Sequence, residues 1–211
     1  MTPNRGDTRS RSMAGGMAEP ASDEALMLAY QAGQATAFDA LYGRWRSRLF
    51  RYLRHQCGDA AVAEELYQDI WLRVIGARKN YEVAAKFSTW LFRIAHNRLV
   101  DHWRAMGRQA QEVLASYDDH DEDCPNGLCI DPAASPDQLP ERLLERRDLA
   151  EQLVAAIGAL PAAQREVFLL VEEGEMTLEE IANATGTGRE TVKSRLRYAL
   201  AKLRAELKEW Q

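Results

Sequence analysis

The sequence predicts an all-α protein, made of two small helical domains that a flexible acidic linker joins. Apolar residues recur every three or four positions through residues 23–107 and again through 142–208, and no segment shows the alternation of a strand. Between these blocks, residues 108–141 are rich in Asp, Pro, Gly and Ser, a composition that favours disorder. A length of 211 residues is sufficient for two such domains.

The first 22 residues carry no apolar core, so we expect a disordered leader and no signal peptide. No run of 18 apolar residues occurs, so no membrane insertion is expected. Three cysteines in 211 residues favour a reducing cytoplasm over a disulfide scaffold. The expected organisation is a leader (1–22), a first helical domain (23–107), a linker (108–141) and a second helical domain (142–211).

Four helices are expected in the first domain, at about 23–33, 36–57, 60–77 and 88–104. Thr36 is a good capping residue for the second helix, and Gly58 and Asp59 interrupt it at its far end. Residues 78–87 form a loop. In the second domain, helices at about 142–158 and 161–173 precede a closely spaced helix pair, and Pro161 stands in the first turn of its helix.

The helix pair begins at a capping box, because Thr177 and Glu180 have the required spacing. Gly186 and Gly188 allow a sharp turn with positive φ. The second helix then runs from about residue 189. Its apolar stripe consists of Val192, Leu196, Ala199, Leu200, Leu203 and Leu207.

The other face of this second helix is polar and basic. Residues 189–208 contain seven Lys or Arg and two acids. The exposed positions expected on this face, together with the first residue of the helix, are Arg189, Glu190, Lys193, Ser194, Arg197 and Tyr198. A lone helix with such a face is usually only solvated. The preceding helix and the glycine turn favour a helix-turn-helix that enters a DNA major groove.

The net charge of −5 does not oppose DNA binding, because the charge is segregated. Nine of the 32 acidic residues lie in 109–141, which has no Lys or Arg, so the rest of the chain carries 27 basic and 23 acidic residues. The charge of the surface that faces the DNA decides groove binding, and the net charge of the whole chain does not.

The segment FSTWLFRIAHNRLVDHWR (87–104) interleaves aromatic rings with arginines. Rings and cations suit unpaired bases, which need a stacking surface and neutralised phosphates. The loop before it, with Asn80 and Tyr81, offers a pocket for an extruded base. The alternative is that these rings pack in the core. A second segment, AEELYQDIWLRVI (63–75), presents polar residues beside an apolar stripe, either as a solvated face or as a docking surface.

Two further motifs are LPAAQREVFLL and TLEEIANATGTGRETVKSRLRYALAKL. With these and the two segments above, the chain resembles the extracytoplasmic-function (ECF) sigma factors of the sigma-70 family. The resemblance covers about 24–107 and 142–208. It implies a region 2 domain and a region 4 domain without the intervening region 3. The chain departs from the family pattern at Glu65, Tyr67 and Trp71, and at Arg189–Glu190. The resemblance therefore does not imply which bases of the −35 element are read.

The resemblance implies three sets of contacts. The third helix docks on the β′ clamp helices of core RNA polymerase through Asp69, Ile70, Trp71 and Arg73. The loop and fourth helix melt and read the promoter −10 element through Asn80, Tyr81, Phe87, Ser88, Trp90, Arg93, Asn97 and Arg98. The last helix reads the −35 element through the six residues given above. The resemblance also implies an anti-sigma factor as a partner.

Two other classes stay open. A stand-alone helix-turn-helix regulator would bind duplex DNA without polymerase, and a nuclease-like enzyme would need a catalytic set. No phosphate-binding loop, metal carboxylate pair or Ser–His–Asp set occurs, so neither a catalytic residue nor a cofactor is expected. His120, Cys124 and Cys129 lie close together, but C-x4-C is not the usual zinc spacing, so we expect ordinary linker residues rather than a metal site or a redox pair.

Overall fold

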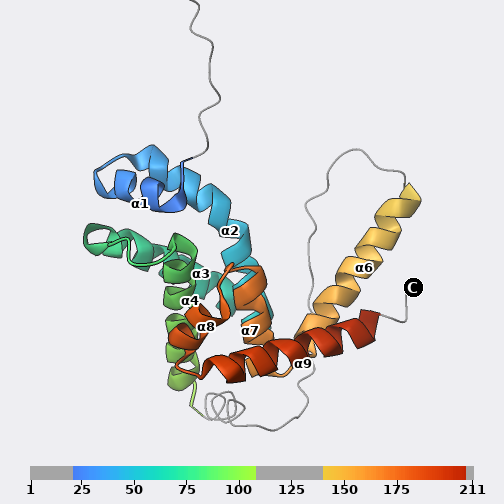
Figure 1. The fold of residues 1–211 in the computed structure, drawn as a ribbon. Coiled ribbons are helices and arrows are strands. Elements are labelled where there is room, and N and C mark those ends of the chain that lie inside the picture. The colour runs from blue at the N-terminus through green and yellow to red at the C-terminus, as the bar shows by residue number, and fades with distance from the viewer. Residues whose placement is uncertain (1–20, 108–139, 208–211) are drawn as a thin grey trace, which may run out of the picture.

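The computed structural model describes residues 21–107 and 140–207, and gives the side chains of these except 140–148. The described residues are helical apart from short connections, as Figure 1 shows, which confirms the all-α class. The first block contains α1 (Asp23–Gln31), α2 (Ala35–Cys57), α3 (Ala60–Ala77), the short 3-10 helix η1 (Arg78–Asn80) and α4 (Phe87–Ala105). The second block contains α6 (Pro140–Gly158), α7 (Ala162–Glu172), α8 (Leu178–Thr185) and α9 (Arg189–Leu207).

The predicted leader and linker fall almost entirely outside the described residues, in 1–20 and 108–139. His120, Cys124 and Cys129 lie there too. The division of the chain into four parts therefore stays a proposal, supported by the match between the two helical blocks and the two predicted domains.

Side chains cap the starts of several helices. The Ala25 amide donates to Ser22 Oγ (3.2 Å) at the start of α1, and the Ala61 amide donates to Asp59 Oδ1 (2.7 Å) at the start of α3. The prediction that Thr36 caps α2 is wrong. Gly33, at φ +102°, turns the chain immediately after α1, so α2 begins earlier and Thr36 lies inside its first turn.

Two of the four described glycines with positive φ directly follow a helix. Gly58 has φ +70° after α2, and Gly186 has φ +69° after α8, as predicted for both breaks. Gly188 does not adopt positive φ, contrary to expectation. One left-handed residue is enough, because the amides of Gly186 and Thr187 already bond to the Ala182 carbonyl and close the end of α8.

The core of the first block is aromatic. Tyr52, Phe87 and Phe92 are fully buried, and the Phe92 ring meets those of Tyr52 and Trp45 edge-on at 5.3 and 6.2 Å. On α3, the residues spaced by four in the sequence form the apolar stripe, since Leu66, Ile70 and Val74 are buried and Val62 packs beside them.

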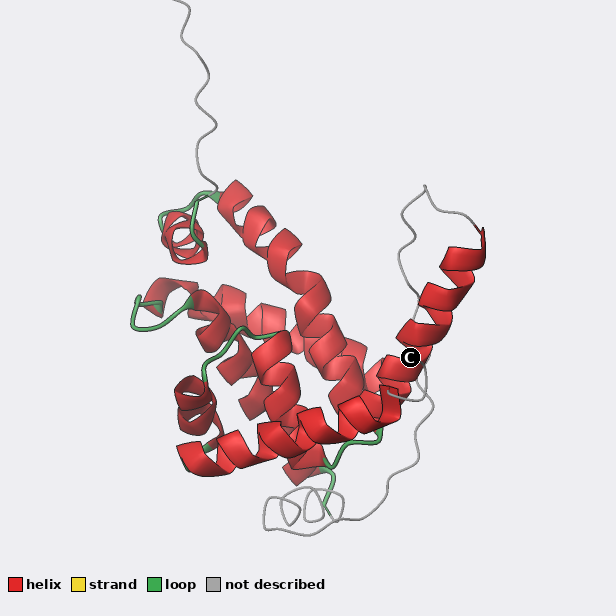
Figure 2. Cartoon of the chain, turned by 45° about the vertical axis from the view of Figure 1, so that its right-hand side comes forward, coloured by secondary structure: helices red, strands yellow, loops and turns green. Residues whose placement is uncertain are grey.

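The two blocks pack against each other. In Figures 1 and 2, α7 lies against α2 and α8 lies beside α4, and contacts join both pairs. Buried apolar residues form one continuous cluster from Met27 in α1 to Leu203 in α9. The periodicity of the sequence predicts each domain, but it does not predict this joint core, because the pairing of distant helices leaves no local signal.

Candidate nucleic-acid interface

The helix pair α8–α9 forms as predicted. Thr177 Oγ1 accepts from the Glu180 amide (3.3 Å), and the Thr177 amide donates back to Glu180 Oε2 (2.8 Å), which completes the capping box. Burial would by itself raise the pKa of Glu180, but hydrogen bonds from Thr177 and Thr89 outweigh it and lower the pKa. Glu180 therefore stays ionised at the positive end of the α8 dipole.

The polar face of α9 points away from the core. Val192, Ala199 and Leu203 are buried on the opposite side. Of the six predicted −35 residues, five are exposed and Ser194 is half-buried. Figure 1 shows α9, in red, as a long helix at the edge of the molecule, which leaves this face accessible.

Charges on this face are held by local partners. Glu190 lies 3.5 Å from Lys193 Nζ and 3.8 Å from Arg189, so it orients both cations. The Arg197 guanidinium lies over the Tyr198 ring, 5.0 Å from its centroid, and donates to the Tyr198 hydroxyl at 3.3 Å. The face thus offers donors in a partly ordered array, as major-groove reading requires.

The predicted −10 residues divide into an exposed and a buried set. Asn80, Arg93 and Asn97 are exposed, and Trp90 and Arg98 are half-buried. Tyr81, Phe87 and Ser88 are buried, with Phe87 at 0% exposure.

The buried rings support the exposed set. The Tyr81 ring meets Trp90 at 5.1 Å and Phe87 at 6.5 Å, and Phe87 meets Trp90 at 5.8 Å. Glu24 accepts from the Phe87 amide (2.8 Å), which fixes the first turn of α4 to α1. Burial raises the pKa of Tyr81, whose hydroxyl has no hydrogen-bond partner among the described residues. The aromatic cluster therefore presents Trp90 as its accessible ring.

The predicted polymerase-binding residues on α3 divide in the same way. Asp69 and Arg73 are accessible, whereas Ile70 and Trp71 are buried and pack α3 onto α2. Arg73 Nε donates to Asp69 (3.2 Å), and Arg98 of α4 donates to the same carboxylate. Burial would raise the pKa of Asp69, but these two arginines lower it. Asp69 therefore stays ionised and joins α3 to α4.

Two apolar side chains on α3 were not among the predicted site residues. Leu72 is 66% exposed and Ile75 is 40% exposed. Both lie off the stripe of Leu66, Ile70 and Val74, and that departure from the helical period was the signal in the sequence. Exposed apolar residues beside Asp69 and Arg73 suit a helical partner.

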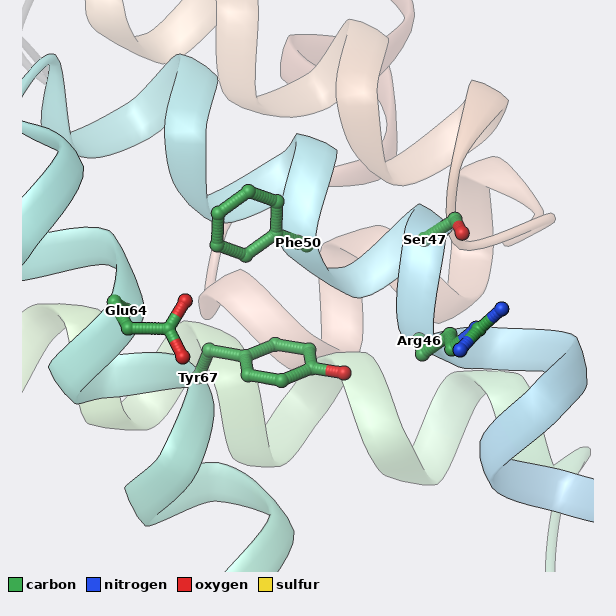
Figure 3. Close-up of a pocket in the computed structure, with 5 residues that line it drawn as sticks. All are labelled: Arg46, Ser47, Phe50, Glu64 and Tyr67. Carbon is green, nitrogen blue, oxygen red and sulfur yellow. The ribbon is translucent and has the colours of Figure 1, made fainter. Parts of the chain in front are cut away.

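A hollow of about 250 Å³ lies between α2 and α3 (Figure 3). Its lining residues are Arg46, Ser47, Phe50, Glu64 and Tyr67, and the rings of Phe50 and Tyr67 meet edge-on at 5.5 Å. None of them is a predicted DNA contact, so this hollow adds nothing to the interface.

Other chemistry is sparse in the described ranges. They contain no group of three or more His, Cys, Asp or Glu side chains arranged to hold a metal ion. Burial raises the pKa of the half-buried Cys57 thiol to about 12, so this cysteine is not a reactive thiolate. None of the described helices is both long and apolar enough to cross a bilayer.

Comparison with known proteins agrees with both helical blocks. Residues 41–109 match the sigma-70 region 2 family, and residues 156–205 match the sigma-70 region 4 family. The chain is 31% identical over 172 residues to the ECF RNA polymerase sigma factor RpoE of Cereibacter sphaeroides, which covers 81% of this chain and 86% of that relative. It is 30% identical over 182 residues to the ECF sigma factor SigK of Mycobacterium ulcerans, covering 85% and 90%.

Solved structures show the same fold. The sigma factor RpoE in complex with the anti-sigma factor NepR, from Bartonella quintana, has a TM-score of 0.58 at 23% identity, covering 82% of this chain and 98% of that one. CnrH in complex with the cytosolic domain of CnrY has a TM-score of 0.56 at 23% identity, covering 90% and 99%.

A region 2 module and a region 4 helix-turn-helix on one chain define a transcription initiation factor of the sigma-70 type. The chain belongs to the ECF sigma factors of this family. Its function is that of an RNA polymerase sigma factor, which directs promoter-specific initiation of transcription.

Proposed function

We propose that α9 reads the −35 element as duplex DNA. The observation that carries this proposal is the accessible face of α9, where Arg189, Lys193 and Arg197 stand beside Glu190 and Tyr198. The opposite stripe of α9 is held in the core by the buried Val192, Ala199 and Leu203, with Leu196, Leu200 and Leu207 half-buried. Arginine pairs with the O6 and N7 atoms of guanine, and a carboxylate accepts from the N4 amine of cytosine. We expect the hydroxyl of Ser194, which is half-buried, to contact a phosphate or a base edge.

We propose that α4 and the preceding loop hold the melted −10 strand. Asn80, Trp90, Arg93 and Asn97 supply direct contacts, because they are at least partly accessible. Tyr81 and Phe87 act from beneath, by keeping Trp90 in place, and Ser88 is buried in the first turn of α4. A ring held in this way stacks on a base without losing much conformational entropy.

We propose that α3 docks on the β′ clamp helices of core polymerase through Asp69, Leu72, Arg73 and Ile75, while Ile70 and Trp71 set the shape of the helix from inside. The chain itself is no enzyme, because the chemistry of RNA synthesis belongs to the polymerase. We also propose that the chain acts in the cytoplasm, because this reducing compartment keeps thiols such as that of Cys57 free and the chain has few cysteines.

We propose that an anti-sigma factor controls this chain. The support is that the two structures of similar fold, RpoE with NepR and CnrH with CnrY, are both sigma factors bound to such partners. The exposed apolar residues of α3 are a surface that such a partner can cover.

The test is transcription from a randomised promoter library with purified core polymerase, with and without this chain. The expected result is new transcripts only when both are present, with start sites downstream of a shared pair of motifs. Sequence-specific duplex binding without polymerase, and no new transcripts with it, would instead identify a stand-alone regulator. Cleavage of nucleic acid by the chain alone would identify an enzyme.

A further inference from the structure

The loop that precedes α4 is buried at both ends and exposed in between. Residues 82–86 are all exposed, whereas Tyr81 before them and Phe87 after them are buried. In Figures 1 and 2 this loop projects from the side of the molecule on which α1 lies. A side chain of α1 is hydrogen-bonded to the backbone at each end of the loop, so α1 is placed to set its shape.

Gln31, the last residue of α1, holds the first end. Its side-chain Nε2 donates to the Lys79 carbonyl oxygen at 3.1 Å and to the Tyr81 carbonyl oxygen at 3.2 Å. These two carbonyls flank Asn80, whose side chain is exposed and is one of the proposed −10 contacts. A side-chain amide has two N–H groups, so Gln31 uses both of them on the backbone beside one base-contacting residue.

Glu24, two turns earlier in α1, holds the other end. Its Oε1 accepts from the Phe87 amide at 2.8 Å, at the start of α4, where the N-cap residue Lys86 makes no side-chain capping bond. Burial would by itself raise the pKa of Glu24, but hydrogen bonds, the strongest of them from Phe87, outweigh it and lower the pKa. The carboxylate therefore stays ionised beside the positive end of the α4 dipole.

The spacing of these two anchors makes the loop arch. Glu24 and Gln31 are seven residues apart, so they lie on the same face of α1, about 10 Å apart along its axis. The chain from Tyr81 to Phe87 can extend over roughly 20 Å. Because its ends are held closer together than that, the residues between them project outward.

Other contacts fix α1 in place. Asp23 accepts from Arg44 Nη1 at 2.6 Å and from Trp45 Nε1 at 2.8 Å, which joins the start of α1 to α2. The Arg78 guanidinium, just before the loop, lies over the Tyr30 ring, 4.9 Å from its centroid. The loop is therefore anchored to a helix that is itself anchored.

We propose that Gln31 is a positioning residue for −10 recognition: it holds the backbone on both sides of Asn80, so that the Asn80 side chain meets an unpaired base in one orientation. Gln31 touches no base itself, because its donors are engaged by the backbone. Glu24 supports the same loop from the other end. The inference rests on the proposed function of the loop and α4, and it adds the residue that sets their selectivity.

Trypsin tests the hold on the loop without DNA or polymerase. The bond it cuts after Lys79 carries the carbonyl that Gln31 binds, and the bond after Lys86 carries the amide that Glu24 binds. Gln31→Met, which keeps the length of the side chain and has no donor, should speed cutting after Lys79 at least about threefold, because proteolysis follows the population of the released backbone. Glu24→Ala should do the same after Lys86. Mass spectrometry separates the two sites.

Transcription from a −10 promoter library tests the effect on selectivity. With core polymerase, Gln31→Met should reduce the preference for the favoured base at one −10 position about fivefold. Its −35 preference, thermal unfolding and affinity for core polymerase should match the wild type. Gln31→Lys restores a donor and should return the preference to within about twofold of the wild type.

Gln34 provides matched controls for both substitutions. It is an exposed glutamine three residues after Gln31, and its side chain makes no capping bond. Gln34→Met should leave trypsin cutting and the −10 preference unchanged. Gln34→Lys adds the same charge as Gln31→Lys, so it separates the effect of the charge from that of the donor.

Asn80→Ala tests whether Gln31 acts through Asn80. This substitution should remove the preference at the same −10 position. Adding Gln31→Met should then cause no further loss, because the side chain to be positioned is absent.

Four outcomes would overturn the inference. They are unchanged cutting after Lys79 in Gln31→Met, an unchanged −10 preference in that variant, an equal loss in Gln34→Met, and a further loss when Gln31→Met is added to Asn80→Ala. A wild-type holoenzyme with no −10 preference at all would instead refute the proposed function, and the trypsin rates would still measure the hold of α1 on the loop.

Discussion

At the scale of single residues, burial separates contact from support. Sequence reasoning grouped Tyr81, Phe87 and Trp90 together, because rings in an amphipathic helix look alike in one dimension. Only packing shows that Phe87 is enclosed and that Trp90 keeps an accessible edge. On α3, likewise, Ile70 and Trp71 are buried, whereas the neighbouring Leu72 is exposed. The chemistry of the candidate site was therefore readable from the sequence, but the depth of each side chain was not.

Arg197→Ala should weaken discrimination at one −35 base pair by about 1–3 kcal/mol if the guanidinium pairs with guanine. The side chain is already ordered by the Tyr198 ring, so little entropy is lost on binding. Binding of the reconstituted holoenzyme to a set of −35 variants measures the effect. Arg204→Ala, which removes an exposed arginine from the last turn of the same helix, should weaken all sequences equally. An unchanged preference in Arg197→Ala would reject the assignment.

His55 should make the protein less stable in mild acid. Burial lowers the pKa of His55 to about 4, from about 6.5 in the unfolded chain, with Arg165, Arg51 and Arg54 adding to the shift and Glu173 opposing it. Because the unfolded chain then binds more protons, the free energy of unfolding falls as pH drops from about 6.5 toward about 4.

The loss attributable to His55 should be about 2 kcal/mol between pH 7 and pH 5. Urea unfolding at both values of pH, for the wild type and for His55→Gln, isolates it. The variant should lose that much less on acidification. Equal pH dependence in the two proteins would show that His55 is not the group responsible.

At the scale of helices, the sequence predicted nearly everything. Helix ends followed from local chemistry, as with the Thr177–Glu180 capping box and the left-handed Gly186. The errors also have local causes. Thr36 has a side chain suited to a cap, but Gly33 turns the chain three residues before it, so α2 already begins at Ala35. The position of this turn decides where the helix starts, because the preference for a capping residue is worth only about 1 kcal/mol.

Thr177→Ala should destabilise the helix-turn-helix by about 1 kcal/mol, because both halves of the capping box are lost. Thermal unfolding and −35 duplex binding should both weaken. Thr36→Ala is the control, since Thr36 makes no capping bond and is exposed in the first turn of α2. Its effect should stay within about 0.5 kcal/mol. Similar losses in the two variants would contradict the role of the box.

Leu72→Ser should weaken binding to core polymerase about tenfold without unfolding the chain, since Leu72 is an exposed apolar residue of α3 and a buried Leu contributes about 1.5–3 kcal/mol. Leu28→Ser, at another exposed leucine of the same block, should bind normally. Fluorescence anisotropy with labelled chain measures both. Normal binding by Leu72→Ser would show that the polymerase-binding surface does not include this part of α3.

At the scale of the whole molecule, the contact between the blocks was beyond sequence reasoning. Four acids of the second block pair with side chains of the first block, and their partners lie 70 or more residues away in the chain. These acids are Glu166, Glu173, Glu175 and Glu180. No spacing rule joins residues so far apart. The charge segregation visible in the sequence concerned the linker, whereas the charges that close the structure are inside the two domains.

The apolar cluster that runs from Met27 to Leu203 has a consequence for how the chain unfolds. Because the two blocks share this cluster, loss of packing in one block removes support from the other. Calorimetry should therefore record one melting transition for the described helices rather than two.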